Sequence, residues 1–250
     1  MPVIHLDDAW TIVGHLNGGY LAARVAALAS EALDGAPPLT LSVHYLAPAR
    51  GPGPAEADVE VLRRSRLSTA RVRLEREGVT LVEALVTAGT PRPGASVLDT
   101  APPPDIPAWD DCPAASEGWD GSTPGMELLG HLETRLHPDD TAALAGGPAR
   151  TPARFRGWVR YRDGSPADRT LALAAWDALP PTPWAAHLWG ATPTVAAQLV
   201  LFPGDVHGPL LVEARCDALH DGVAEETARV WDSTGRLLVS SRQTALLVTT

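Results

Sequence analysis

Two polar residues in the second half of this 250-residue chain stand where fold stability alone does not explain them. Asp177 is the last polar residue of a helix predicted over residues 165–179, so its negative charge opposes the negative end of the helix dipole. Gln243 lies in a predicted strand with a mainly apolar face, where an amide without a hydrogen bond costs about 1–3 kcal/mol. A carboxylate can accept a proton, and an amide can bind and orient a molecule. The structural alternatives are a solvated helix end for Asp177 and an amide bonded to neighbouring backbone for Gln243.

A glycine pair opens the first predicted helix. Gly18 and Gly19 expose backbone N–H groups at a helix N-terminus, a site that favours an anion or a polarised carbonyl. Tight packing of the helix on a sheet explains the two glycines equally well. His15 and Asn17 precede the pair and could line the same pocket, although a histidine on an apolar strand is also a common core residue.

One dense basic cluster is present, formed by Arg63, Arg64 and Arg66. The arginine fork suits bidentate contact with phosphate, so this cluster is a candidate for the phosphates of a substrate such as coenzyme A. The alternative is a solvated strand end.

Composition limits the classes of function. The formal charge is −10, from 20 basic and 30 acidic residues, which argues against a nucleic-acid surface. Cys112 and Cys216 have no metal-ligand spacing, so we expect no metal and no cofactor. The first residues lack the basic and apolar regions of a signal peptide, and the longest helix-like apolar segment, residues 20–33, is shorter than the roughly 20 residues of a membrane span. We therefore expect a cytoplasmic protein without a membrane span.

Residues 1–90 predict a compact α+β unit. Apolar residues recur at helical spacing over residues 18–33, and Asn17 is in place as the N-cap. After Pro37 and Pro38 the pattern changes to period two, which predicts four antiparallel strands near residues 39–46, 57–64, 68–77 and 80–89. Residues 91–124 are rich in Pro, Gly, Asp and Ser, which indicates a linker.

The second unit, residues 125–250, repeats the pattern of the first. Gly53-Pro54 matches Gly208-Pro209 at an offset of 155, and the strands that follow correspond. The helix over residues 165–179 stands before them, with a predicted capping box of Ser165 and Asp168. Each half is therefore expected to be one helix on a curved antiparallel sheet.

The segments that carry this pattern resemble the acyl-CoA thioesterase II type of double-hotdog proteins. They are HLNGGYLAA at 15–23, LSVHYLAPA at 41–49, the stretch 59–72, WDALPP at 176–181 and GRLLVSSRQ at 235–243. The resemblance implies two hotdog units joined edge to edge in one chain, each sheet wrapped around one long helix. It also implies hydrolysis of an acyl-CoA or related thioester, and a homo-oligomer.

The resemblance assigns catalytic roles to particular residues. Asp177 matches the family's catalytic Asp, and Gln243 matches its water-orienting Gln. The family's third residue is Thr or Ser, where the alignment puts Asp217, a departure from the pattern. Asp217 alternates with Glu213 and Arg215, so the alternative for it is a solvated strand face.

Other functions fit the sequence less well. No G-x-S-x-G elbow is present, which disfavours an α/β-hydrolase route, and no D-x-x-x-x-H run like that of the hotdog hydratases occurs. A non-catalytic protein that binds acyl thioesters or acts as a scaffold stays open, because the departure at Asp217 could mean a lost activity.

Overall fold

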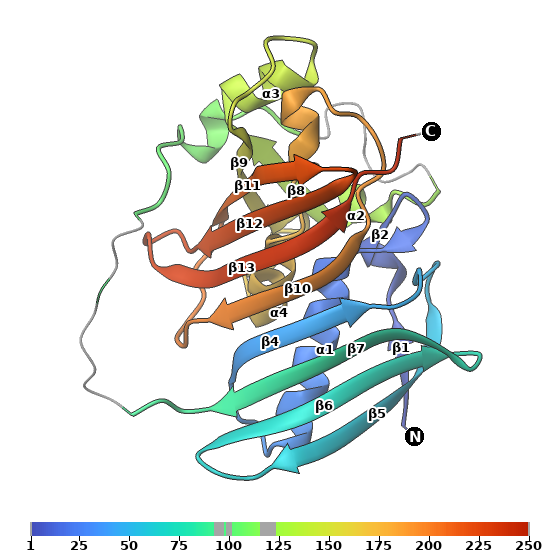
Figure 1. Ribbon diagram of the computed structural model, residues 1–250. Coiled ribbons are helices and arrows are strands. Elements are labelled where there is room, and N and C mark those ends of the chain that lie inside the picture. The colour runs from blue at the N-terminus through green and yellow to red at the C-terminus, as the bar shows by residue number, and fades with distance from the viewer. Residues whose placement is uncertain (1, 93–97, 99–101, 116–123, 250) are drawn as a thin grey trace.

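The computed structural model describes residues 2–92, 98, 102–115 and 124–249. Within them, eleven strands form one antiparallel sheet in the order β1-β5-β6-β7-β4-β10-β13-β12-β11-β9-β8. The sheet curves around two helices, α1 (Gly18–Ala32) and α4 (Arg169–Ala175), as Figure 1 shows. First-half strands occupy one side of the sheet and second-half strands the other, which confirms the predicted α+β double hotdog.

The first half contains the predicted helix and all four predicted strands. α1 begins after Asn17, whose side-chain oxygen accepts the N–H of Tyr20 at 3.0 Å, so the predicted N-cap is confirmed. The four strands are β4 (Pro38–Tyr45), β5 (Gly53–Arg63), β6 (Leu67–Arg76) and β7 (Val79–Gly89). Short elements that the sequence pattern did not predict are β1 (Val3–Leu6), η1 (Asp8–Trp10), β2 (Thr11–Ile12) and β3 (His15–Leu16).

The second half has the corresponding sheet but a shorter helix than predicted. Its matching strands are β9 (Ala153–Tyr161), β10 (Thr194–Leu201), β11 (Leu210–His220), β12 (Val223–Trp231) and β13 (Leu237–Leu246). The predicted helix over residues 165–179 is too long, and the predicted capping box of Ser165 and Asp168 is wrong. α4 starts after Asp168, which is itself the N-cap. The Asp168 carboxylate accepts the Leu171 N–H at 2.8 Å and the Tyr161 hydroxyl at 3.0 Å, which fixes the helix start there. Asp177 consequently lies two residues beyond the end of α4.

The two halves meet where β4 pairs with β10. Leu41 lies opposite Leu199, and Val43 lies opposite Ala197, with the inward side chains of both strands buried. This pairing makes one continuous sheet, and the core runs across both halves without a boundary. The predicted edge-to-edge pseudo-dimer is therefore confirmed.

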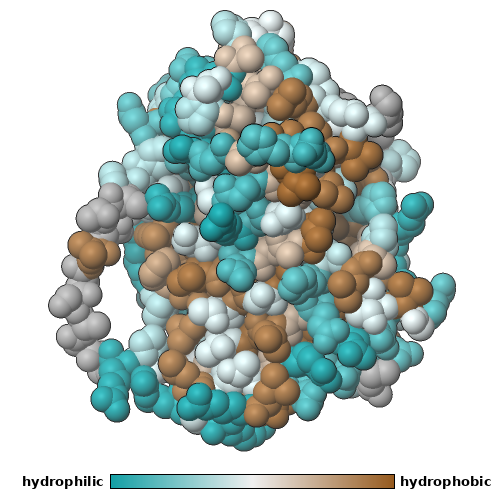
Figure 2. Space-filling view, in the orientation of Figure 1, coloured by the Kyte–Doolittle hydropathy of each residue, from teal (hydrophilic) through white to brown (hydrophobic). Residues whose placement is uncertain are grey.

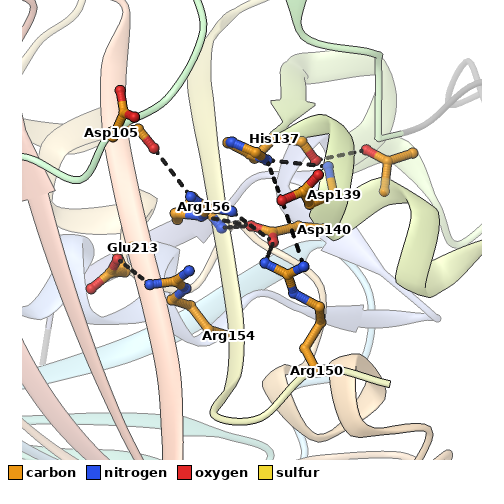
Figure 3. Close-up of polar contacts among 9 residues, drawn as sticks. Asp105, His137, Asp139, Asp140, Arg150, Arg154, Arg156 and Glu213 are labelled. Atoms are coloured by element: carbon orange, nitrogen blue, oxygen red, sulfur yellow. Dashed lines mark hydrogen bonds and ion pairs between the residues drawn. The ribbon is translucent and has the colours of Figure 1, made fainter. Parts of the chain in front are cut away.

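The second half carries additional elements beside its sheet. They are η2 (Trp109–Asp111), α2 (Glu127–His131), β8 (Leu132–Leu136), α3 (Pro138–Leu144) and η3 (Thr182–Ala186). A buried ion pair joins α3 to β9: both Asp140 carboxylate oxygens accept from the Arg156 guanidinium, at 3.0 and 3.1 Å (Figure 3). Arg156 also donates to the Asp105 carbonyl at 3.1 Å, so part of the predicted linker packs against this half. Both side chains are buried and the contact is bidentate, the geometry in which an Arg–Asp pair is strongest.

The outer face of the sheet is turned away from the helices. Figure 2 shows apolar groups among polar ones on this face. Leu85, Val200 and Leu246 are exposed there, on β7, β10 and β13. None of the described helices has the length and apolar character needed to cross a membrane.

Candidate active site

The Asp177 carboxylate lies at the N-terminus of α1, although the two belong to different halves. Its Oδ2 atom accepts the backbone N–H of Gly19 and the side-chain Nδ2 of Asn17, both at 3.0 Å. Asn17 Nδ2 also donates to the backbone carbonyl of Asp177 at 2.8 Å. These contacts hold the carboxylate at the positive end of the α1 dipole. The site therefore requires both halves of the chain.

The glycine pair serves both purposes that its sequence suggested. A Cβ atom at Gly19 would lie 2.4 Å from the backbone oxygen of Ala174, so only glycine permits this approach of α1 to α4. A Cβ atom at Gly18 would lie 3.0 Å from Asp177 Oδ2. The close packing is what brings the N–H of Gly19 within hydrogen-bond distance of the carboxylate.

Burial raises the pKa of Asp177 from 3.8 to about 7. Loss of hydration is the largest cause; the N–H groups of Gly19 and Gly18 and the Asn17 side chain lower the pKa, while the charge of Glu226 raises it. The carboxyl group therefore exchanges between its ionised and protonated forms near neutral pH. A general base works best when its pKa is close to the operating pH.

Tyr45 on β4 closes the other side of this helix terminus. Its hydroxyl donates to the Gly18 carbonyl at 2.6 Å. Burial, and then the charge of Asp177, raise the pKa of Tyr45 well above 10, so the phenol stays neutral. Tyr45 therefore fixes the backbone of the glycine pair as an uncharged donor.

Gln243 is bonded to side chains rather than to backbone. Its Oε1 atom accepts the Thr194 hydroxyl at 3.0 Å, and its Nε2 atom donates to Glu226 Oε2 at 2.5 Å. The other oxygen of Glu226 accepts the hydroxyl of Thr182. Three elements besides β13 thus hold the amide: β10, β12 and, through Thr182, η3. The amide is half-buried, and both of its ends are satisfied.

Four of these residues were missed by the sequence analysis: Tyr45, Thr182, Thr194 and Glu226. Glu226 had a detectable signal, because it alternates with Ala224 and Ala228 on the buried face of β12. Thr194 begins its strand and contacts Gln243 across 49 positions of sequence, so no local pattern indicates it.

Asp217 lies on the solvent side of β11. Its side chain is 40% exposed and pairs with Arg215 at 2.5 Å on the same strand. The pairing register shifts between Cys216 and Ala218, so Asp217 occupies an irregularity of the strand. The structure does not bring it to Gln243, and the hydroxyl group beside that amide comes from Thr194 instead.

The predicted basic cluster lies at the opposite end of α1 from Asp177. Arg64 pairs with Asp34 at 3.0 Å and donates to the carbonyl of Ala32, the last residue of the helix. Arg63 and Arg66 are exposed at the same turn. The 15 residues of α1 separate this cluster from Asp177 by about 20 Å at 1.5 Å per residue. Its role with phosphate stays a prediction.

His15 lies on β3, two residues before Asn17. Its Nδ1 atom is 2.9 Å from the Val13 carbonyl, and the residue is partly exposed. Among the residues that the structure describes, no cluster of three or more His, Cys, Asp or Glu side chains is arranged to hold a metal ion.

A cavity of about 310 Å³ opens between α1 and α4. Its walls include Ala23 and Leu173 from the helices and Leu201 and Val239 from β10 and β13. Leu173 is the lining residue nearest to Asp177 in sequence and stands four positions before it. Most of the lining is aliphatic, but Ser30, Glu31 and Arg169 also lie on it, toward the end of α1 and the start of α4.

Comparison with known proteins gives consistent matches. Two family models match the chain: an acyl-CoA thioesterase N-terminal domain over residues 6–89 and an acyl-CoA thioesterase C-terminal domain over residues 102–247. An uncharacterized protein of Mycobacterium tuberculosis (strain H37Rv) is 30% identical over 267 residues, which cover 97% of this chain and 89% of that protein. The crystal structure of a candidate thioesterase II from Thermobifida fusca YX matches with a TM-score of 0.87 and 31% identity, over 99% of this chain and 92% of that one. Acyl-CoA thioesterase II TesB2 from Mycobacterium marinum shares the fold, with a TM-score of 0.72 at 18% identity, over 99% and 93% of the two chains.

Proposed function

This chain belongs to the acyl-CoA thioesterase family, and we propose that it hydrolyses an acyl-CoA or a related acyl thioester to the free acid and the thiol. The observation that carries the proposal is the Asp177 carboxylate, placed at the N-terminus of α1 with its pKa raised to about 7. A carboxylate that only caps a helix has a lowered pKa, because the dipole and the N–H donors favour its charged form. Asp177 combines those donors with a raised pKa, which suits a general base.

In the proposed reaction, Asp177 takes a proton from water while the water oxygen attacks the thioester carbonyl carbon. The Gln243 amide and the Thr194 hydroxyl orient this water. The positive end of the α1 dipole stabilises the negative charge that develops on the carbonyl oxygen. The C–S bond then breaks, the electron pair leaves with sulfur, and the proton on Asp177 passes to the thiolate.

The cavity between α1 and α4 supports an acyl substrate. We assign it to the hydrocarbon part of that substrate, because its walls are mainly aliphatic and Leu173 on its lining stands four positions before Asp177. We keep Arg63, Arg64 and Arg66 as the proposed contact for coenzyme A phosphates.

The alternative of a non-catalytic binding or scaffold protein has lost its main support. That support was the acidic residue Asp217 in place of a hydroxyl group. The Thr194 hydroxyl contacts Gln243 directly, so the proposed site has a neutral donor beside the amide.

The test is release of free thiol from a panel of acyl-CoAs of increasing chain length, followed with a thiol reagent. Cys112 and Cys216 are both buried, so the protein itself should give little background. We expect release that is linear in protein concentration and abolished in the Asp177→Asn variant. Absence of release from every acyl-CoA by a folded protein would contradict the proposal and favour the binding protein.

We also propose that the chain acts as a cytoplasmic homo-oligomer. The exposed apolar side chains on the outer sheet face, Leu85, Val200 and Leu246, offer a surface for a second copy. Light scattering at micromolar concentration should give a multiple of the 26.3 kDa chain mass. A purely monomeric mass would contradict this part of the proposal.

A further inference from the structure

Glu226 is a buried acidic residue that makes no ion pair within the described part of the chain. It is 5% exposed and lies between Ala224 and Ala228 on the inner face of β12. Its two oxygens accept hydrogen bonds from Gln243 Nε2 and from the Thr182 hydroxyl, and both donors are neutral. Burial of a carboxylate without a counter-charge costs several kcal/mol. Fold stability therefore does not explain this residue.

The first half of the chain has an apolar residue at the matching position. Ala70 on β6 lies opposite Val86 on β7, as Glu226 on β12 lies opposite Gln243 on β13. Both Ala70 and Val86 are fully buried. The hotdog sheet thus accepts two apolar residues here, and the acid and the amide occur together only in the half that supplies Asp177.

We propose that Glu226 is a positioning residue of the thioesterase site: it fixes the orientation of the Gln243 amide and places a negative charge near Asp177. This inference rests on the proposed function. An ionised carboxylate can only accept hydrogen bonds, so it holds Nε2 of the amide and excludes the flipped orientation. The amide oxygen then stays toward Thr194, and the carboxylate polarises the amide so that this oxygen becomes a better acceptor for water.

The charge of Glu226 reaches Asp177 without an opposing cation. Within the described residues, the charge of Glu226 on β12 raises the pKa of Asp177, and the charge of Asp177 raises that of Tyr45 on β4. Tyr45 stays neutral, as described above. The donors from α1 and its N-cap, Gly19 and Asn17, are also neutral. Glu226 is therefore the one charged neighbour in this set that makes Asp177 harder to ionise, and hence a stronger base.

The role of Glu226 is tested by comparing Glu226→Gln with a matched control, Glu225→Gln. Glu225 is the next residue of β12, but it faces the other way and pairs with Arg242 at 2.8 Å. We measure kcat/KM for one acyl-CoA between pH 5 and 9. Glu226→Gln should move the acidic limb of the profile down by about one pH unit, because the nearby negative charge is lost. It should also lower the plateau by about tenfold, because the amide can flip. Glu225→Gln should change neither.

A second variant and a second readout separate orientation from charge. Glu226→Asp keeps the charge but shortens the reach to Gln243, so the plateau should fall while the acidic limb stays near that of the wild type. The Asp177 carboxyl group is also titrated by ¹³C NMR, with its signal assigned by its loss in Asp177→Asn. Its pKa should fall in Glu226→Gln.

These readouts distinguish two failures. If the wild type hydrolyses no thioester, the proposed function is wrong, and the NMR titration still decides whether Glu226 acts on Asp177. If the wild type is active while a folded Glu226→Gln keeps its plateau, its acidic limb and the Asp177 pKa, the inference about Glu226 is overturned and the proposed function stands.

Discussion

The two halves of the molecule place different side chains at equivalent positions of the same sheet. On β13 and β12 of the second half, Gln243 lies opposite Glu226. On β7 and β6 of the first half, Val86 lies opposite Ala70. The backbone pairing is the same, so the fold tolerates either set. In the proposed mechanism, the chemistry therefore depends on polar residues that the second half carries at a cost in stability, and not on the hotdog fold itself.

The helix ends differ in the same way. Asp34 and Asp177 each stand two residues after the last residue of a helix, α1 and α4 respectively. The Asp34 side chain is 87% exposed and forms a surface ion pair with Arg64. Asp177 is held by the N-terminus of the opposite helix instead. The comparison shows that position after a helix does not decide the role of an aspartate; the element that covers it does.

The largest expected effect is loss of activity in Asp177→Asn. The amide keeps the shape of the side chain but cannot accept the proton of water, and loss of a general base typically costs about 10²–10⁴ in rate. The matched control is Asp34→Asn, the corresponding helix end of the first half, whose kcat/KM should stay within about twofold of the wild type, since a surface ion pair has little effect. Steady-state kinetics with one acyl-CoA provides the measurement. Nearly full activity in a folded Asp177→Asn would remove Asp177 from the mechanism.

The pH dependence should reveal the raised pKa of Asp177. The base must be ionised, so kcat/KM should rise with pH up to about 7 and decline about tenfold per unit below it. The free energy of unfolding should decrease over the pH range in which kcat/KM increases. The folded protein favours the protonated acid, so the wild type loses stability as pH rises from about 4 through about 7.

Urea unfolding at pH 4.5 and pH 8 checks the second part. The stability of Asp177→Asn relative to the wild type should be higher at pH 8 than at pH 4.5, because the variant has no carboxyl group to ionise. An unchanged difference between the two pH values would mean that folding does not raise the pKa of Asp177.

Gly19→Ala should destabilise the protein by about 1–3 kcal/mol, because the new methyl group would overlap the Ala174 carbonyl and push the helices apart. Thr170 occupies the same second position in α4, but it lines the cavity. Thr170→Ala should therefore change the free energy of unfolding by no more than about 0.5 kcal/mol. Equal effects of the two substitutions in urea unfolding would show that the helix contact is not the tight one described.

The smallest effect on rate is expected for Gln243→Ala, about tenfold in kcat/KM, which is the loss of one orienting contact. Asp217→Ala serves as its control and should keep wild-type kinetics, because the carboxylate pairs with Arg215 at the surface. If Asp217→Ala lowers activity as much as Gln243→Ala does, the site extends to β11 and the assignment of Thr194 as the hydroxyl partner loses its basis.

Features with a local signal could be predicted from the sequence. The α1 helix, its Asn17 cap and the glycine pair are adjacent in the chain, and their spacing determines their roles. Gln243 could be identified because period-two alternation puts it on an apolar strand face. The same alternation places Glu226 on the buried face of β12, so the sequence pattern was sufficient to identify this residue.

Features that depend on long-range pairing could not be predicted. The Thr194 contact joins β10 to β13, and its register follows from the whole sheet rather than from either segment. The expectation for Asp217 rested on aligning its segment with the family pattern, whereas the hydroxyl group that contacts Gln243 comes from Thr194 on another strand. The start of α4 likewise depends on the Tyr161 hydroxyl, which reaches Asp168 from β9.

The seam between β4 and β10 has a consequence for how such a site can arise. In a dimer of two identical hotdogs, each mutation appears twice, so a new buried acid brings two desolvation penalties to the assembly. In this chain the seam joins two halves with separate coding segments, and one mutation changes one side only. Glu226 adds its cost once, while Ala70 keeps the other copy apolar. A charged core residue therefore costs the assembly about half as much stability in a fused chain as in a dimer of identical subunits.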